Sequence, residues 1–120
     1  MGAAHEFGKT CEALAAESLR RRGWRVVACN YRFGHREIDL IVRRDGTVAF
    51  VEVKARRGTG YGHPLEAITW RKRREIAVVA RQWIERFGAA GDTFRFDAIA
   101  VTQAGGKTPV IEHVEDAWRL

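Results

Sequence analysis

Hydrophobic and small residues recur every three to four positions in two segments of the chain, which predicts two helices. The first covers residues 6–22, where helix formers continue without proline and Gly23 follows a basic last turn. The second covers residues 65–87 and is ended by Gly88. Its inward stripe consists of Ile68, Ile76, Val79 and Trp83. A glycine-rich loop over residues 56–64 precedes it.

Elsewhere the apolar residues alternate with polar ones or run together, as they do in strands. The predicted strands cover residues 24–31, 37–43, 48–55, 93–101 and 110–114, the last as an edge strand. Asp45-Gly46 is a typical two-residue hairpin turn between the second and third strands. The order αβββαβ, with the further edge strand, predicts one α/β (α+β) domain over residues 1–120, in which helices flank a mixed central sheet.

The predicted hairpin brings two carboxylates together. With a two-residue turn at Asp45-Gly46, facing residues have numbers that sum to 91, so Asp39 faces Glu52. Alternation places Lys54 on the same side of the sheet. The charged side also holds Glu37, and the opposite, apolar side holds Ile38, Leu40, Val42, Val51 and Val53. Two carboxylates about 5 Å apart repel by roughly 3 kcal/mol at an effective dielectric of 20, so selection for stability alone would avoid this pairing.

A divalent cation, Mg²⁺ or Mn²⁺, would remove this repulsion. Mg²⁺ takes oxygen ligands from one or two carboxylates, keeps several waters and accepts phosphate oxygens. Asp39 and Glu52 are therefore predicted to bind metal, and Lys54 to orient a water molecule or neutralise developing charge. The alternative is an exposed Glu52–Lys54 ion pair beside a solvated Asp39. Apolar residues flank all three positions, which favours central strands and hence the metal site.

Two side chains on the predicted helices extend this site. Glu12 lies on the face of the first helix that approaches the sheet, where it either reaches the metal or forms a salt bridge with a nearby arginine. Lys72 lies between Ile68 and Ile76 on the inward stripe of the second helix. There it either holds a phosphate or extends along the apolar face with its amine in solvent.

The other basic residues near Lys72 are predicted to point sideways or outward, towards the backbone of a nucleic acid. They are Arg71, Arg73 and Arg74. Trp70 begins this run, and an aromatic residue near a helix start is expected to belong to the core rather than to stack on a base. Arg95 and Asp97 alternate with apolar residues on a strand and are expected to form a structural ion pair.

Composition supports a polyanionic partner. The chain has 21 Lys and Arg against 15 Asp and Glu, a net charge of +6 and a pI near 10.0, so its surface attracts nucleic acid. Cys11 and Cys29 have no metal-binding spacing, which predicts a reduced, cytoplasmic environment. The start of the chain lacks an export signal, and no apolar run reaches the roughly 20 residues needed to span a bilayer, so no membrane is expected.

Five sequence blocks together resemble the YraN family. They are Gly8-xxx-Glu12-xx-Ala15, residues 37–41 (EIDLI), residues 50–56 (FVEVKAR), Gly62-xxx-Glu66 and residues 95–97 (RFD). That family is uncharacterised but is similar to PD-(D/E)xK endonucleases, including Holliday junction resolvases and restriction enzymes. The resemblance implies a restriction-endonuclease-like core with Asp39 and Glu52 as metal ligands, Glu12 as an additional acidic ligand and Lys54 as the catalytic lysine. Arg36 departs from the family, which often has glycine there.

These observations predict a Mg²⁺- or Mn²⁺-dependent endonuclease that hydrolyses phosphodiester bonds in DNA, branched or damaged DNA included. Its nucleic-acid-binding residues would be Lys72, Arg71, Arg74 and Arg56. One alternative is a non-catalytic nucleic-acid-binding module that keeps the nuclease-like fold, and another is a small protein-interaction domain. Junction-cutting enzymes usually act as pairs, so analogy adds a homodimer as an option.

Overall fold

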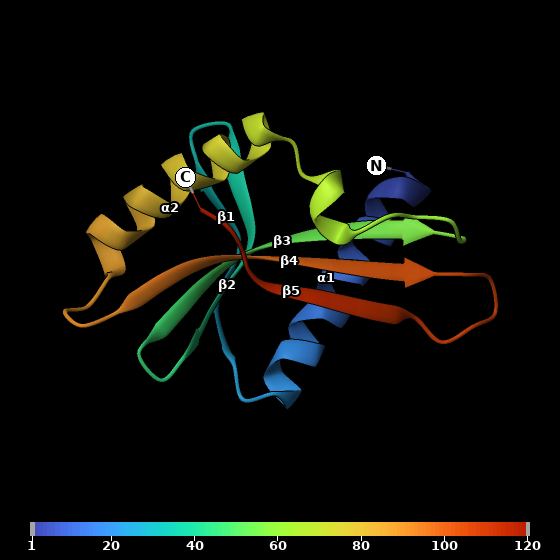
Figure 1. Ribbon diagram of the computed structural model, residues 1–120, viewed down its shortest axis with the longest axis horizontal. Helices are drawn as coiled ribbons and strands as arrows, with labels where there is room; N and C mark the ends of the chain where they lie inside the picture. The colour runs from blue at the N-terminus through green and yellow to red at the C-terminus, as the bar shows by residue number, and fades with distance from the viewer. Residues whose placement is uncertain (1, 120) are drawn as a thin grey trace.

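A five-stranded mixed sheet lies at the centre of the protein, with one helix against each face (Figure 1). The computed structural model describes residues 2–119. The elements in chain order are α1 (Ala3–Arg21), β1 (Arg25–Phe33), β2 (Arg36–Arg44), β3 (Thr47–Arg57), the 3₁₀ helix η1 (Pro64–Ala67), α2 (Trp70–Phe87), β4 (Thr93–Gln103) and β5 (Val110–Trp118). The predicted αβββαβ order with a last edge strand, and the mixed α+β class, are confirmed.

The strands lie in sequence order, and only β3 and β4 are parallel. A parallel pair needs a long crossover, which α2 supplies. The β2–β3 hairpin has the predicted register, from Leu40 opposite Val51 to Arg44 opposite Thr47. Asp45 adopts a left-handed conformation, with φ 55°, that lets two residues reverse the chain. The turn therefore fixes which residues of β2 and β3 are neighbours.

The sheet separates two apolar cores. Under α1 lie Cys11, Ala15, Ala16 and Leu19 of the helix with Leu40, Val42, Ala49, Val51, Ile99 and Val101 of the sheet. Under α2, the buried residues include Ile76, Val79 and Trp83 with Ile41, Val48, Phe50 and Ala98. The prediction that Ile38 packs with Leu40 is wrong, because Ile38 lies in the α2 core with Ile41. The alternation of side chains between the two faces of the sheet fails between Ile38 and Leu40, close to Asn30 of β1, whose φ is 50°.

The predicted single helix over residues 65–87 is divided into η1 and α2. Around η1, the His63 ring accepts a hydrogen bond from the Leu65 amide, and Glu66 accepts one from the His63 amide. Thr69 then caps α2, because its hydroxyl accepts a hydrogen bond from the Lys72 amide at 3.1 Å. These local caps favour two helical starts over one continuous helix. Within residues 2–119, no helix is both long and apolar enough to cross a membrane.

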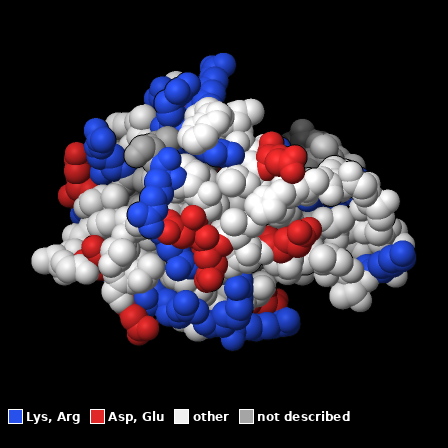
Figure 2. Space-filling view, in the orientation of Figure 1, with Lys and Arg blue, Asp and Glu red and all other residues white. Residues whose placement is uncertain are grey.

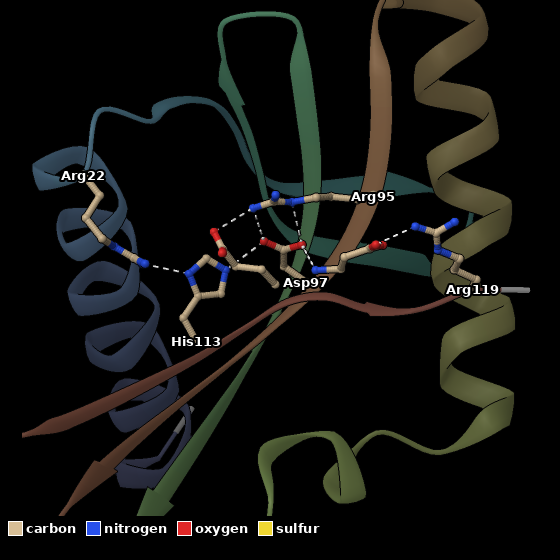
Figure 3. Close-up of polar contacts among 7 residues, drawn as sticks. Arg22, Arg95, Asp97, His113 and Arg119 are labelled. Carbon is tan, nitrogen blue, oxygen red and sulfur yellow. Dashed lines mark hydrogen bonds and ion pairs between the residues drawn. The ribbon is translucent and has the colours of Figure 1, made fainter.

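A buried polar cluster joins β4, β5 and the end of α1 (Figure 3). Asp97 has no exposed side-chain surface and binds Arg95 at 3.0 Å, which confirms the predicted ion pair. It also accepts a hydrogen bond from His113 at 2.7 Å. Arg22 donates to the other ring nitrogen of His113 at 2.8 Å. Because a guanidinium only donates, His113 carries its proton on Nε2 and donates it to Asp97.

Candidate active site

The site begins where β2 and β3 part. Their last paired residues are Leu40 and Val51, whereas β3 stays paired with β4 as far as Arg57. Beyond Val51, therefore, one edge of β3 lacks a strand partner. The Asp39 carboxylate takes that place, because its Oδ2 accepts a hydrogen bond from the Val53 amide at 2.8 Å. The register alone had predicted that Asp39 and Glu52 face each other as a cross-strand pair. They are instead neighbours across the opening between the two strands.

Glu52 is a mostly buried acid with an unsatisfied oxygen. Its side chain is 13% exposed, and Oε1 is buried without a hydrogen-bond partner. Burial, and next the nearby charge of Asp39, raise the pKa of Glu52 to about 8. Burial likewise raises the pKa of Asp39, against the Val53 hydrogen bond, which lowers it. The two carboxyls therefore resist carrying two negative charges at neutral pH without a cation.

Two lysines approach this pair. The Lys72 amine, from the first turn of α2, lies 3.8 Å from Glu52 Oε2, so the predicted inward position of Lys72 is confirmed. Lys54 is exposed at the next position on the same side of β3, and its charge lowers the pKa of Glu52. Lys54 borders a groove of about 270 Å³ that Tyr61, His63 and Glu66 also line. Asp39, Glu52, Lys54 and Lys72 thus form one electrostatic unit.

Glu12 approaches the same opening from α1. Its charge raises the pKa of Asp39, so the two carboxylates are within electrostatic reach. Glu12 accepts a hydrogen bond from Asn30 at 3.1 Å and lies 3.7 Å from the amine of Lys9. Asn30 also donates to Glu37 at 3.0 Å. Sequence reasoning missed Asn30, although asparagine tolerates the left-handed conformation needed at such an irregularity.

The side chains fit a small oxygen-binding cation better than a transition metal. Within residues 2–119, no three His, Cys, Asp or Glu side chains gather as a ready-made metal site, and Glu12 is held by Asn30 and Lys9. Mg²⁺, however, needs only one or two carboxylates and completes its octahedron with water and phosphate. Such an ion would satisfy the Oε1 of Glu52 and would offset the repulsion from Asp39. Asp39 and Glu52 are therefore the residues that fit it.

The basic residues near the site divide into exposed and structural ones. Arg71 and Arg74 are exposed at the start of α2, as predicted, with 87% of the Arg71 side chain in solvent. Lys and Arg side chains gather over this end of the helix, at the top of Figure 2. Arg73 is buried instead, because it donates to the carbonyl groups of Ile68 and Leu65. The prediction that it points outward is wrong.

Arg56 also has a structural position. It is 5% exposed, and its guanidinium donates to the carbonyl groups of Gly62 and His63 at 3.0 and 3.4 Å. The Tyr61 ring lies over it, with its centroid 5.1 Å from the guanidinium carbon. Arg56 therefore holds the loop beside Lys54 together, and in this position it does not offer its charge to a nucleic acid as the sequence had predicted.

The fold and the site define a class of protein: an α+β domain with an αβββαβ core, in which an Asp and a Glu-x-Lys sequence lie where two strands separate. The family model described as uncharacterised protein family UPF0102 matches residues 11–101. A UPF0102 protein from Rhodococcus jostii is 43% identical over 112 residues, covering 93% of this chain and 95% of the relative. One from Chloroherpeton thalassium is 38% identical over 120 residues, covering 94% and 93%. The chain belongs to the UPF0102 family, which is the YraN family, and the resemblance is confirmed.

Proposed function

We propose that this protein is a Mg²⁺- or Mn²⁺-dependent endonuclease that hydrolyses phosphodiester bonds in DNA, including branched or damaged DNA. One observation carries the proposal: Glu52 is buried beside Asp39 with an oxygen that has no partner, at the point where β2 leaves β3. A purely structural pair would be expected to satisfy that oxygen or to replace one acid with an amide. A divalent cation satisfies both carboxylates at once.

Asp39 and Glu52 would hold the cation. When bound, such an ion polarises a phosphoryl oxygen and makes a bound water more acidic. Glu52 would lose its proton on binding, and Lys72, released from Glu52, would donate to a phosphate oxygen of the scissile group. Lys54, exposed on the same side of β3, would orient the attacking water or offset the charge that develops on the phosphate. Glu12 would stay outside the ligand set and, through Asn30, keep the opening polar.

The rest of the surface supports a nucleic-acid substrate. Arg71 and Arg74 are exposed and would bind phosphates on either side of the scissile group, where Arg71 would give up a 4.0 Å ion pair with Glu75. The net charge of +6 attracts a polyanion over a distance. A bacterial-type cytoplasm, DNA rather than RNA, and a homodimer that makes paired cuts remain parts of this proposal.

A calorimetric Mn²⁺ titration tests the site before any substrate is chosen. The wild-type protein should bind Mn²⁺, and Glu52→Gln should weaken binding at least about tenfold, since it removes a charged oxygen ligand. Glu17→Gln, an exposed acid of α1, is the matched control and should bind as the wild type does. Equal affinity in all three proteins would reject the metal site.

Cleavage assays then test the activity. Plasmid, single-stranded and four-way-junction DNA are incubated with Mg²⁺ or Mn²⁺, and the wild type is compared with Asp39→Asn and Lys54→Ala. We expect both variants to lose at least about a hundredfold in rate, as is usual when a charge-stabilising group is removed. Equal residual cleavage by all three proteins would assign the nuclease to a contaminant.

The second candidate function is a nucleic-acid-binding module without turnover. Arg71 and Arg74 favour it, because their exposure does not depend on the carboxylates. Salt-sensitive DNA binding without cleavage in any metal would support this function, and failure to bind nucleic acid at low salt would reject it.

A further inference from the structure

Trp70 differs from the other tryptophans of the chain. Trp24, Trp83 and Trp118 are between 3% and 5% exposed, whereas Trp70 is 59% exposed at the start of α2. The expectation that Trp70 belongs to the core is therefore wrong. A large exposed aromatic gains little for the fold and raises the risk of aggregation, which makes it a candidate for recognition.

The indole of Trp70 is supported on one side. The guanidinium carbon of Arg73 lies 4.4 Å from the centre of its ring. Arg73 is itself fixed, since it is 9% exposed, donates to Ile68 and Leu65 carbonyl groups at 3.0 Å, and lies 5.7 Å from the Trp118 ring. A ring that rests on an immobile cation has little motion left to lose on binding. Its solvent side is then a preorganised flat surface.

The first turn of α2 connects this surface with the candidate active site. Successive residues of a helix are rotated by about 100°, so Lys72, Arg71 and Trp70 point in three directions around its start. Lys72 points to Glu52, Arg71 points outward, and Trp70 lies on the far flank together with Arg74, one turn on. By this rotation, a strand that leaves the site along Lys72 would cross Arg71 and Arg74 before it reached the indole.

We propose that Trp70 stacks against an unpaired nucleobase of the strand that enters the Asp39–Glu52 site, while Arg71 and Arg74 bind the phosphates between that base and the site. This inference rests on the proposed function and specifies its substrate: DNA with single-stranded or unstacked nucleotides next to the cleaved bond. Every base has a flat face, so stacking tolerates any sequence but requires that the base has left its duplex stack. The neighbouring positive charge matches a polyanion and disfavours a purely apolar partner.

The test is a binding titration of the full-length protein with a short single-stranded oligodeoxynucleotide, in EDTA to prevent cleavage. Because the other three tryptophans are buried, iodide should quench mainly Trp70, and the oligonucleotide should change its fluorescence and protect it from iodide. Trp70→Ala should weaken binding about tenfold, and Trp70→Phe should keep most of the affinity, since stacking is worth about 1–3 kcal/mol per base. Phe87→Ala, an exposed aromatic at the other end of α2, should bind as the wild type does.

An abasic oligonucleotide of the same length separates bases from phosphates. Its affinity should be lower than that of the normal oligonucleotide and unchanged by Trp70→Ala. If Trp70→Ala lowers binding of both oligonucleotides equally, or of neither, the stacking role is overturned. Protection of Trp70 by raising the protein concentration alone would also overturn it in favour of self-association. Cleavage with Mg²⁺ is scored separately. Binding that depends on Trp70, without cleavage, rejects the nuclease and supports the stacking. Cleavage that is unchanged by Trp70→Ala supports the nuclease and rejects the stacking.

Discussion

Replacing Glu52 by glutamine should make the metal-free protein more stable at alkaline pH. The folded protein raises the pKa of Glu52 to about 8 from an ordinary value of 4.5, because of burial and the charge of Asp39. Between these two values the folded state binds a proton at Glu52 that the unfolded chain does not. The free energy of unfolding therefore falls as the pH rises through this interval, and is lowest once Glu52 is ionised above pH 8. Glutamine is neutral throughout and avoids that loss.

The size of the effect follows from the pKa. Each pH unit between the two values corresponds to about 1.4 kcal/mol, so the full displacement gives an upper limit of roughly 5 kcal/mol. Lys72, 3.8 Å away, and water that enters the opening reduce the cost of the ionised acid. We expect Glu52→Gln to exceed the wild type by about 2–3 kcal/mol near pH 9 and to match it within about 1 kcal/mol near pH 5.

Urea denaturation in EDTA at several pH values measures this difference directly, with Glu17→Gln as the control that should follow the wild type. Added Mn²⁺ should then raise the melting temperature of the wild type at pH 8 and leave that of Glu52→Gln nearly unchanged. Parallel pH profiles for wild type and Glu52→Gln would show that ionising Glu52 does not lower the stability of the folded protein, so that no cation is needed to offset its charge.

Substitutions at three further positions test the surroundings of the site. Thr69→Ala should cost about 1 kcal/mol of stability in urea denaturation, through loss of the α2 cap, and Thr69→Ser should cost less. Asp97→Ala should cost about 3–5 kcal/mol, because it removes the acceptor of the His113 ring and leaves Arg95 with Glu115 alone; a loss below about 1 kcal/mol would mean that the cluster contributes little to stability. Arg56→Gln should make the loop over residues 58–63 more sensitive to proteolysis without lowering DNA affinity, and a specific loss of affinity in a protected loop would restore Arg56 as a phosphate ligand.

The strand register and the central acids were predictable because they depend on short-range rules. The Asp45-Gly46 turn sets the pairing of β2 and β3, and alternation then puts Glu52 and Lys54 on one side. The inward position of Lys72 followed from helical spacing alone. In each case the side of the strand or helix on which the residue lies follows from local periodicity or from one hairpin turn.

Other features depend on contacts that no periodic pattern of apolar and polar residues encodes. Arg73 and Arg56 look like surface charges until the carbonyl groups that bind them are known. Ile38 lies on the opposite side from Leu40, close to the irregular backbone of Asn30 in β1, which no pattern within β2 reveals. His113 was passed over because its two partners come from α1 and β4. The signal for the divided helix was present, because Thr69 is a residue type that caps helices, but it was weaker than the apolar stripe.

The hydrogen bond between Asp39 and the Val53 amide gives one side chain two duties. If a backbone carbonyl of β2 accepted the hydrogen bond from the Val53 amide instead, β2 and β3 would continue to pair and Asp39 would lose its fixed orientation. The orientation of the proposed metal ligand and the opening between the strands are therefore maintained by the same contact. Asparagine at position 39 would keep the acceptor while removing the charge, whereas alanine would remove both. Only the asparagine variant therefore tests the charge of Asp39 without also disturbing the edge of β3.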